Sequence, residues 1–269
     1  MNKTLNCWWM KTPLPGNFGD ILSPFLVYKL LNIRLNWVDK KDPSMEKYMM
    51  IGSIISSADK NTTVWGSGII SSKVKVCPDS TYLSVRGPIT YEIVKQQGGK
   101  APPIFGDPAL ICPKIHFPKC TKKYEIGIMP HYVDYEQCVK SFSKLKNVKI
   151  INILNSNPFM VIDEILKCKR IVTSSLHGII VCNAYGVPVS WVKLSDKLVG
   201  DSSKFFDHFE SINSKKHTCS RIDNTDNITY EDLQKLTYTT VDPDIINKTS
   251  EDLISVLANN LTRKGILND

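Results

Sequence analysis

Hydrophobic residues along the chain follow two alternating patterns. Short apolar runs are followed by longer stretches in which apolar residues recur every three or four positions. The first pattern predicts strands buried on both faces of a sheet, and the second predicts helices that cover such a sheet. Expected strands lie at 5–10, 33–38, 48–55, 62–65, 81–85, 124–129, 148–153, 170–173 and 187–192. Strands that alternate with helices in this way predict parallel sheets and an α/β fold.

Turn-forming and basic residues mark a connection in the middle of the chain. Pro102-Pro103 is followed by a proline- and lysine-rich segment over residues 112–123. A break of this kind separates two units that each hold several strands. We therefore expect an N-terminal α/β domain over residues 1–118 and a second α/β domain over residues 119–245. The predicted architecture is two Rossmann-like domains that face one another across a cleft.

A final apolar repeat predicts one more helix close to the C-terminus. Thr249 and Asp252 have the spacing of a capping box, which places the start of this helix near residue 249. We expect the segment 246–269 to pack back against a domain, with the N-terminal domain as the candidate.

The segment 169–192 is the most informative stretch of the chain. A short apolar strand ends at small polar residues that include Ser174 and Ser175, and a helix without a polar face follows. The small residues suit a helix N-cap, and His177 lies in the first turn. A titratable side chain thus stands at the carboxyl end of a strand, beside helix N–H groups that attract anions. Ligands bind at such places in open α/β sheets.

Three other strand ends carry residues that suit a site. Gly19 and Asp20 follow the first strand, Gly66 and Gly68 follow the strand 62–65, and Arg86 follows the strand 81–85. Glycines there let the backbone approach a ligand, although for Gly66 and Gly68 a plain turn is the more common explanation. Arg86 suits an anion, although a structural ion pair is an equal alternative. Asp20 either contacts a ligand or caps the helix that follows it.

Composition narrows the class of protein. The 269 residues contain 42% hydrophobic and 22% charged residues, which is typical of a folded globular protein, and a net charge of +8 suits an anionic ligand. The lysines are scattered, so a nucleic-acid-binding stripe is not evident. Eight cysteines form no CxxC pair, which predicts free thiols rather than disulfides or a metal site. No signal peptide or membrane-spanning run is evident, so we expect a cytoplasmic protein, working free or at the inner face of the membrane.

Several short motifs together resemble the polysaccharide pyruvyl transferase family. They occur in the family's order across most of residues 5–211. The motifs are Asn17-Phe18-Gly19-Asp20, Trp65-Gly66-Ser67-Gly68, Ser84-Val85-Arg86-Gly87, Gly106-Asp107-Pro108-Ala109, Pro130-His131-Tyr132, Ser174-Ser175-Leu176-His177-Gly178, Ala184-Tyr185-Gly186-Val187-Pro188 and Lys204-Phe205-Phe206-Asp207.

The resemblance implies a glycosyltransferase-B-like fold and a specific reaction. Members transfer the enolpyruvyl unit of phosphoenolpyruvate to two hydroxyls of a sugar, which gives a pyruvate ketal on a cell-surface polysaccharide or its precursor. The family's histidine falls on His177 and its arginine on Arg86. Many members have an arginine two residues before that histidine, where this chain has Ser175.

The chemistry of this donor suggests roles for the candidate residues. Phosphoenolpyruvate carries about three negative charges and needs cationic partners and backbone N–H donors. We expect Arg86 and Lys193 to contact the donor, with His131 as a further candidate. His177 is the expected general acid or base, because transfer needs a group that exchanges protons near neutral pH. Ser174, Ser175, Asp20, Gly19, Gly66 and Gly68 complete the predicted substrate-binding set.

Two other functions share part of this pattern. A glycosyltransferase with a nucleotide-sugar donor would have the same cleft and the same anion site. A glycan- or nucleic-acid-binding module would bind without turnover. We expect no metal and no cofactor beyond phosphoenolpyruvate as a substrate. The expected partners are that donor and a saccharide acceptor, lipid-linked or free, with peripheral contact to a membrane surface as a further candidate.

Overall fold

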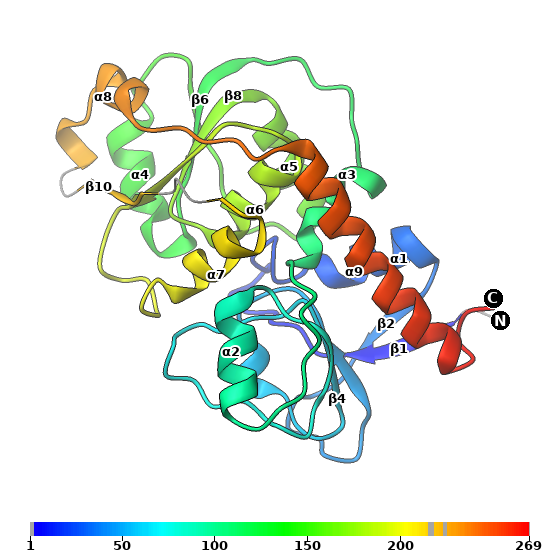
Figure 1. The fold of residues 1–269 in the computed structure, drawn as a ribbon. Helices are drawn as coiled ribbons and strands as arrows, with labels where there is room; N and C mark the ends of the chain where they lie inside the picture. Colours follow the sequence, from blue (N-terminus) through cyan, green and yellow to red (C-terminus); the bar gives the residue numbers. More distant parts are fainter. Residues whose placement is uncertain (1–2, 215–217, 223–224, 269) are drawn as a thin grey trace.

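The structure is a computed structural model, which describes residues 3–214, 218–222 and 225–268. Its described residues contain two parallel five-stranded sheets, one in each half of the chain (Figure 1). The first sheet has the order β2-β1-β3-β4-β5. Its strands are β1 (Thr4–Cys7), β2 (Arg34–Trp37), β3 (Lys47–Met49), β4 (Thr62–Trp65) and β5 (Thr81–Ser84).

The second sheet repeats the order of the first. Its strands lie in the order β10-β9-β8-β6-β7, so that its first strand along the chain is again flanked by its second and its third. They are β6 (Tyr124–Met129), β7 (Val148–Ile150), β8 (Cys168–Thr173), β9 (Val189–Lys193) and β10 (Ser220–Arg221). In such a sheet the chain reverses direction between the first and third strands, and a crevice opens at their carboxyl ends. Each half of the molecule has one such crevice.

Helices cover both sheets. They are α1 (Leu22–Leu31), α2 (Pro88–Gln96), α3 (Cys112–Ile115), α4 (Tyr135–Phe142), α5 (Pro158–Leu166), α6 (Leu176–Ala184), α7 (Ser203–Ser211), α8 (Tyr230–Lys235) and α9 (Pro243–Arg263). The alternation of strands and helices is as predicted, and the ranges 62–65 and 124–129 coincide with β4 and β6. The long strand expected at 48–55 is wrong. Only Lys47–Met49 pairs, because the chain turns at Gly52, whose φ is +109°.

The start predicted for the C-terminal helix is also wrong. Helix α9 begins at Pro243, with the Asp242 side chain accepting a hydrogen bond from the Asp244 N–H. Thr249 and Asp252 lie in its interior, where Asp252 pairs with Lys248. The spacing of a capping box also occurs within a helix, so it does not by itself locate a helix start. The capping box present in the structure is formed by Thr229 and Asp232 at the start of α8.

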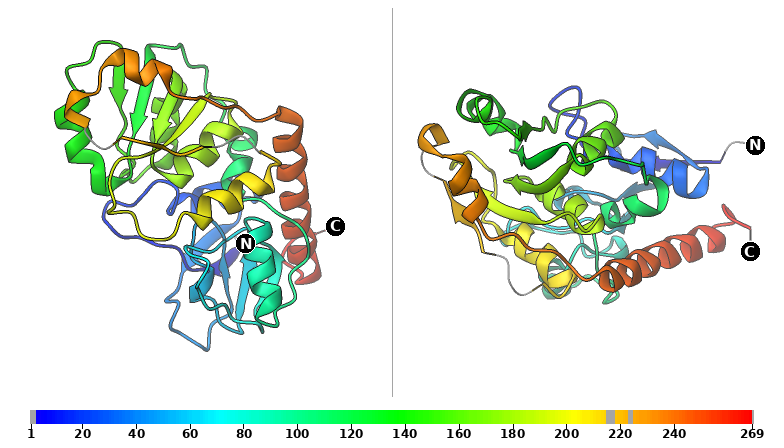
Figure 2. Two further views of the ribbon diagram at one scale, coloured as in Figure 1. Left: turned by 60° about the vertical axis from the view of Figure 1, so that its left-hand side comes forward. Right: turned by 90° about the horizontal axis from the view of Figure 1, so that it is seen from above.

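Helix α9 runs beside both halves of the molecule (Figure 2). It contacts α6 of the second half and β5 of the first. The Trp65 indole N–H donates to the Leu253 carbonyl at 2.9 Å, and the Tyr48 hydroxyl donates to Asn260 Oδ1 at 2.7 Å. These hydrogen bonds and the buried Leu253, with no exposed surface, hold α9 on the first half. The exact domain boundaries stay a prediction.

A buried ion pair joins the two halves on the side of α2 and α7. Arg86 follows β5, and its Nε donates to Asp207 Oδ2 of α7 at 3.0 Å, with both side chains fully buried. Asp207 also accepts from the Thr90 N–H at 2.8 Å and from the Thr90 hydroxyl at 2.6 Å. A Cβ on Gly87 would lie 1.8 Å from the Asp207 carbonyl oxygen, so only glycine permits this approach. The pair therefore fixes α7 of the second half against the first.

Two further observations concern the cysteines and the apolar character of the helices. All eight cysteines are free thiols, as their spacing predicts, and burial raises the pKa of Cys138 and Cys168 to about 12. Within the described residues, no helix is both long and apolar enough to cross a bilayer.

Replacing Asp207 tests the ion pair. Asp207→Ala leaves the Arg86 guanidinium buried without its counter-charge, which costs about 3–5 kcal/mol of unfolding free energy. The matched control is Asp252→Ala, because Asp252 pairs with Lys248 at the surface of α9, and such a pair contributes about 0.5 kcal/mol. Urea denaturation of both variants gives the two values. Equal losses would contradict a joining role for Asp207.

Candidate active site between the two sheets

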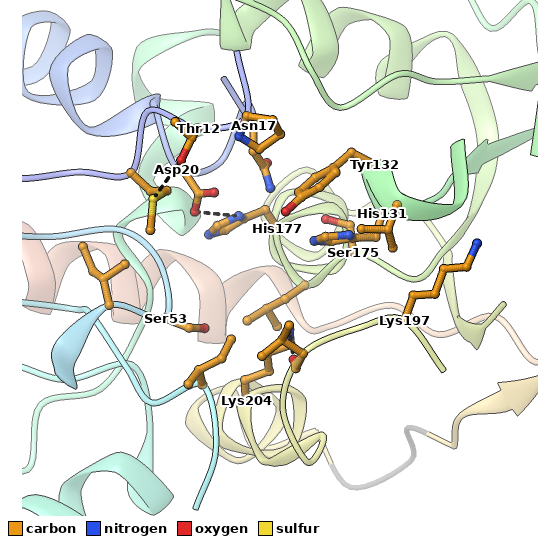
Figure 3. Close-up of a pocket in the computed structure, with 17 residues that line it drawn as sticks. Thr12, Asn17, Asp20, Ser53, His131, Tyr132, Ser175, His177, Lys197 and Lys204 are labelled. Carbon is orange, nitrogen blue, oxygen red and sulfur yellow. Dashed lines mark hydrogen bonds and ion pairs between the residues drawn. The ribbon is translucent and has the colours of Figure 1, made fainter. Parts of the chain in front are cut away.

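A cavity of about 500 Å³ lies where the two crevices face each other (Figure 3). Residues that follow β1, β3 and β4 line it from the first half, and residues that follow β6, β8 and β9 line it from the second. The lining residues are Met10, Thr12, Pro13, Asn17, Asp20, Ser53, Ile54, Ile70, His131, Tyr132, Val133, Ser175, Leu176, His177, Lys197, Val199 and Lys204. The carboxyl ends of neighbouring strands at a reversal point are the usual ligand site of such sheets. In this protein the reversal points of both sheets line the same cavity.

The start of α6 places His177 on this cavity. The Thr173 hydroxyl, at the end of β8, donates to the Met129 carbonyl at 2.6 Å and accepts from the Ser175 N–H at 3.0 Å. Ser175 then caps the helix by accepting from the Gly178 N–H at 3.4 Å. His177 follows in the first turn with 6% of its surface exposed, and its buried Nε2 has no hydrogen-bond partner in the part of the chain that the structure describes. A buried polar atom without a partner is uncommon in a native protein, so a bound molecule is the natural partner.

The segment after β1 closes on His177 from the first half. A Cβ on Gly19 would lie 2.0 Å from Cγ of His177, so the imidazole ring packs directly on the Gly19 backbone. Asp20 Oδ1 lies 3.9 Å from His177 Nδ1 (Figure 3). Helix α1 has Ile21 at its N-cap, without a capping hydrogen bond from a side chain. Asp20 is therefore directed at the cavity and does not cap α1.

Burial shifts the pKa values of Asp20 and His177 in opposite directions. The pKa of Asp20 is raised to about 7 by burial and by the nearby Asp107 carboxyl, against the opposing charge of Lys204. The pKa of His177 is lowered to about 3 by burial, and further by the charges of Arg86, Lys204 and His131. Near neutral pH the imidazole is thus uncharged and the carboxyl is close to half protonated. The two groups form an acid and a base whose available proton lies on Asp20.

His131 lies beside Ser175 at the cavity wall (Figure 3). Its backbone N–H donates to Ser174 Oγ at 2.9 Å, and its ring packs on Tyr132 with ring centres 4.2 Å apart. Burial and the charge of Lys204 lower the pKa of His131 to about 4. Ser174 does not line the cavity, because its hydroxyl holds the segment that carries His131.

Besides Ser174 and Gly19, four more predicted site residues lie outside the cavity wall. Arg86 donates to Ser53 Oγ at 2.8 Å and to the Ile69 carbonyl at 2.6 Å, in addition to Asp207. Gly68 gives this side chain room, since a Cβ there would lie 2.5 Å from Arg86 Cζ. Gly66 has a φ of +80° and packs against Pro108. Lys193 pairs with Asp196 at 2.6 Å and lines a smaller cavity beside the main one. Donor contact by these four residues stays a prediction.

Two lysines reach the cavity that the predicted site did not include. Lys204 lies on α7 with 8% of its surface exposed, whereas Lys197 is exposed at the rim. Lys204 opens the compact apolar motif Lys204-Phe205-Phe206-Asp207, and a lysine at the start of such a motif is a signal that could have identified it. Lys197 lies in a polar loop that carries no such signal.

The described residues contain no group of three or more histidine, cysteine or acidic side chains arranged to hold a metal ion. The expectation that the protein needs no metal and no cofactor stays a prediction. The polar groups of the cavity are instead proton donors, proton acceptors and cations.

Comparison with known proteins identifies the family. A family model described as polysaccharide pyruvyl transferase matches residues 19–196, which is well over half of the chain. An uncharacterized protein of Acanthamoeba polyphaga mimivirus is 29% identical over 252 residues, covering 89% of this chain and 86% of that protein. No solved structure matches the chain. The matched region begins at Gly19 and contains His131 and His177, and the chain belongs to the polysaccharide pyruvyl transferase family.

Proposed function

We propose that this protein transfers the enolpyruvyl unit of phosphoenolpyruvate to two hydroxyls of a saccharide and releases phosphate. The family supports transfer of a pyruvyl group to a saccharide acceptor. The observation that carries the proposal is the unpartnered Nε2 of His177, which lies beside a protonatable Asp20 on the wall of a 500 Å³ cavity. Proton transfer in both directions is what formation of a ketal from an enol phosphate requires.

Asp20 supplies the first proton. Its carboxyl is protonated in about half of the molecules near pH 7, and it gives that proton to the methylene carbon of the donor. The adjacent carbon becomes an oxocarbenium-like centre, which the first sugar hydroxyl attacks. His177 is uncharged at this pH and accepts the proton of that hydroxyl. One new C–O bond and one new C–H bond have then formed.

The second half of the reaction restores both residues. The C–O bond to phosphate breaks, and phosphate leaves with the proton held by His177. The second sugar hydroxyl adds to the same carbon and gives its proton to Asp20. The products are the pyruvate ketal and inorganic phosphate, and each side chain returns to its starting protonation state.

We propose in addition that the two halves form a glycosyltransferase-B-like arrangement. Two parallel sheets of the same strand order that turn their carboxyl ends toward one cavity support it. A donor bound at the start of α6 in the second half would face an acceptor held by the segment after β1 in the first half.

Donor identity is tested by the product that is released. The protein is incubated with a panel of glycan acceptors and either phosphoenolpyruvate or nucleotide sugars. The expected result is release of inorganic phosphate from phosphoenolpyruvate that depends on the acceptor. Release of a nucleotide from a nucleotide sugar, without use of phosphoenolpyruvate, would instead identify a glycosyltransferase.

His177→Ala is expected to lower kcat by at least about a hundredfold, because it removes the base and leaves the helix cap at Ser175 in place. The matched control is His116→Ala, because His116 lies outside the cavity and pairs with Asp163 at 2.7 Å. Phosphate release is measured for both variants, and circular dichroism checks their folding. A folded His177→Ala variant with near-normal kcat would show that His177 has no catalytic role.

The raised pKa of Asp20 predicts a pH dependence. Asp20 donates a proton only in its protonated form, which predominates below its pKa of about 7. The value of kcat/KM should therefore fall above pH 7, approaching a tenfold loss per pH unit, and should show no second loss down to about pH 5, because the pKa of His177 is about 3. Asp20→Asn should lower the rate and remove the fall that begins near pH 7, which leaves only the later loss as Lys204, whose pKa is about 8, becomes neutral. A fall that persists unchanged in Asp20→Asn would assign it to another group.

A further inference from the structure

Lys204 is a buried lysine that makes no direct ion pair with a carboxylate of the described residues, although the Asp20 carboxyl acts on it at longer range. Its ammonium donates to the Val199 carbonyl at 3.3 Å, and no carboxylate of the described residues lies within 4.0 Å of its Nζ. The contrast with Lys47 is direct. Lys47 is also buried, at 1% exposed, but its Nζ pairs with Asp59 at 2.6 Å and donates to the Asp42 carbonyl at 2.9 Å.

A buried ammonium without a counter-ion is unfavourable, because the low dielectric of the interior does not replace its hydration. The surroundings of Lys204 increase this cost, since burial and the nearby charge of Arg86 lower the pKa of Lys204 to about 8, against the opposing charge of Asp20. The carboxylate of Asp207 is committed to Arg86 and Thr90 and does not neutralise Lys204. The cavity therefore has a positive charge that an incoming ligand can satisfy.

The start of α6 faces the same cavity. The Ser175 hydroxyl is already used as the helix cap, so α6 contributes polar groups to the wall but no cation. On this side of the cavity, Nε2 of His177 and Nδ1 of His131 are buried polar atoms without a hydrogen-bond partner among the described residues. The N-terminus of a helix favours a negative charge, and a lysine on a second element supplies the point charge that such an anion needs.

We propose that Lys204 of α7 and the first turn of α6 together form an anion-binding site that holds the phosphate group of the donor. The identification of this anion as the phosphate of phosphoenolpyruvate rests on the proposed function, whereas the presence of an anion site does not. The phosphate lies between the two elements, with its oxygens accepting from the Lys204 ammonium. This position directs the rest of the donor toward Asp20 and His177.

Binding of two probes tests the site. Inorganic phosphate and phosphoenolpyruvate are titrated calorimetrically at constant ionic strength into the wild type, Lys204→Met, Lys204→Arg and the surface control Lys248→Met. Lys204→Met should weaken the binding of both probes by more than about tenfold, because a charge-assisted hydrogen bond is lost. Lys204→Arg should recover part of the affinity, and Lys248→Met, which removes the same charge from an exposed position on α9, should bind as the wild type does.

Thermal unfolding separates a binding role from a structural one. Without ligand, Lys204→Met should be as stable as the wild type or more stable, because an unpaired buried charge is replaced by an apolar side chain of similar length. Phosphate should raise the Tm of the wild type and not that of Lys204→Met. A clear loss of stability in Lys204→Met, with unchanged phosphate affinity, would show that Lys204 is structural and would overturn the proposal.

The outcomes also distinguish this proposal from the proposed function. If Lys204→Met binds both probes as the wild type does while phosphoenolpyruvate is turned over, the anion site is wrong and the function stands. If the wild type binds inorganic phosphate through Lys204 but never uses phosphoenolpyruvate, the site stands and the proposed donor is wrong. Failure of the wild type to bind either probe at millimolar concentration would overturn the anion site.

Discussion

The buried pair of Arg86 and Asp207 fixes the distance between the two sheets, and the cavity depends on that distance. Arg86 comes from the end of β5 and Asp207 from α7, so their contact brings the carboxyl ends of both sheets toward one volume. The absence of side chains at Gly19, Gly68 and Gly87 allows the close approach. At Gly19 the consequence is chemical, because the backbone packs on the ring of His177 and sets Asp20 beside it.

The same pair shapes the electrostatics of the site without contributing a group to its wall. The charge of Arg86 lowers the pKa of both His177 and Lys204 through space, although its guanidinium is hydrogen-bonded to Asp207, Ser53 and Ile69. Burial acts in the same direction on these two groups and in the opposite direction on Asp20. A partly buried cavity of this kind holds a neutral base and a partly protonated acid near pH 7, which is the combination that proton transfer to a carbon atom requires.

The sequence predicted the helices and strands of the fold better than the boundaries that depend on long-range contacts. Strands such as β4 and β6 are rich in β-branched, aromatic and apolar residues, and Ser175 caps α6 as its position indicates. The start of α9 was misplaced, because a capping-box spacing recurs inside helices. The strand at 48–55 was too long, since the turn at Gly52 depends on hydrogen bonds from distant residues such as the Gly68 N–H.

For the candidate site, too, the sequence predicted local positions but not contacts between distant residues. His177, Asp20, His131 and Ser175 each follow a strand, and the parallel arrangement brings them together, as their positions predict. The position of Arg86 at a strand end could not reveal that Asp207, 121 residues later, holds its guanidinium away from the cavity. Lys204 was not predicted because its approach to α6 depends on how α7 packs, although its place at the start of a compact apolar motif was a local signal.

The most direct test of this account is an experimental structure of the protein with phosphoenolpyruvate bound. The account predicts the donor in the cavity between the two sheets, with its phosphate on Lys204 and the start of α6. Its methylene carbon should lie about 3–3.5 Å from a carboxyl oxygen of Asp20, within reach for proton transfer. A donor bound outside this cavity, or one whose methylene carbon faces away from Asp20, would contradict it.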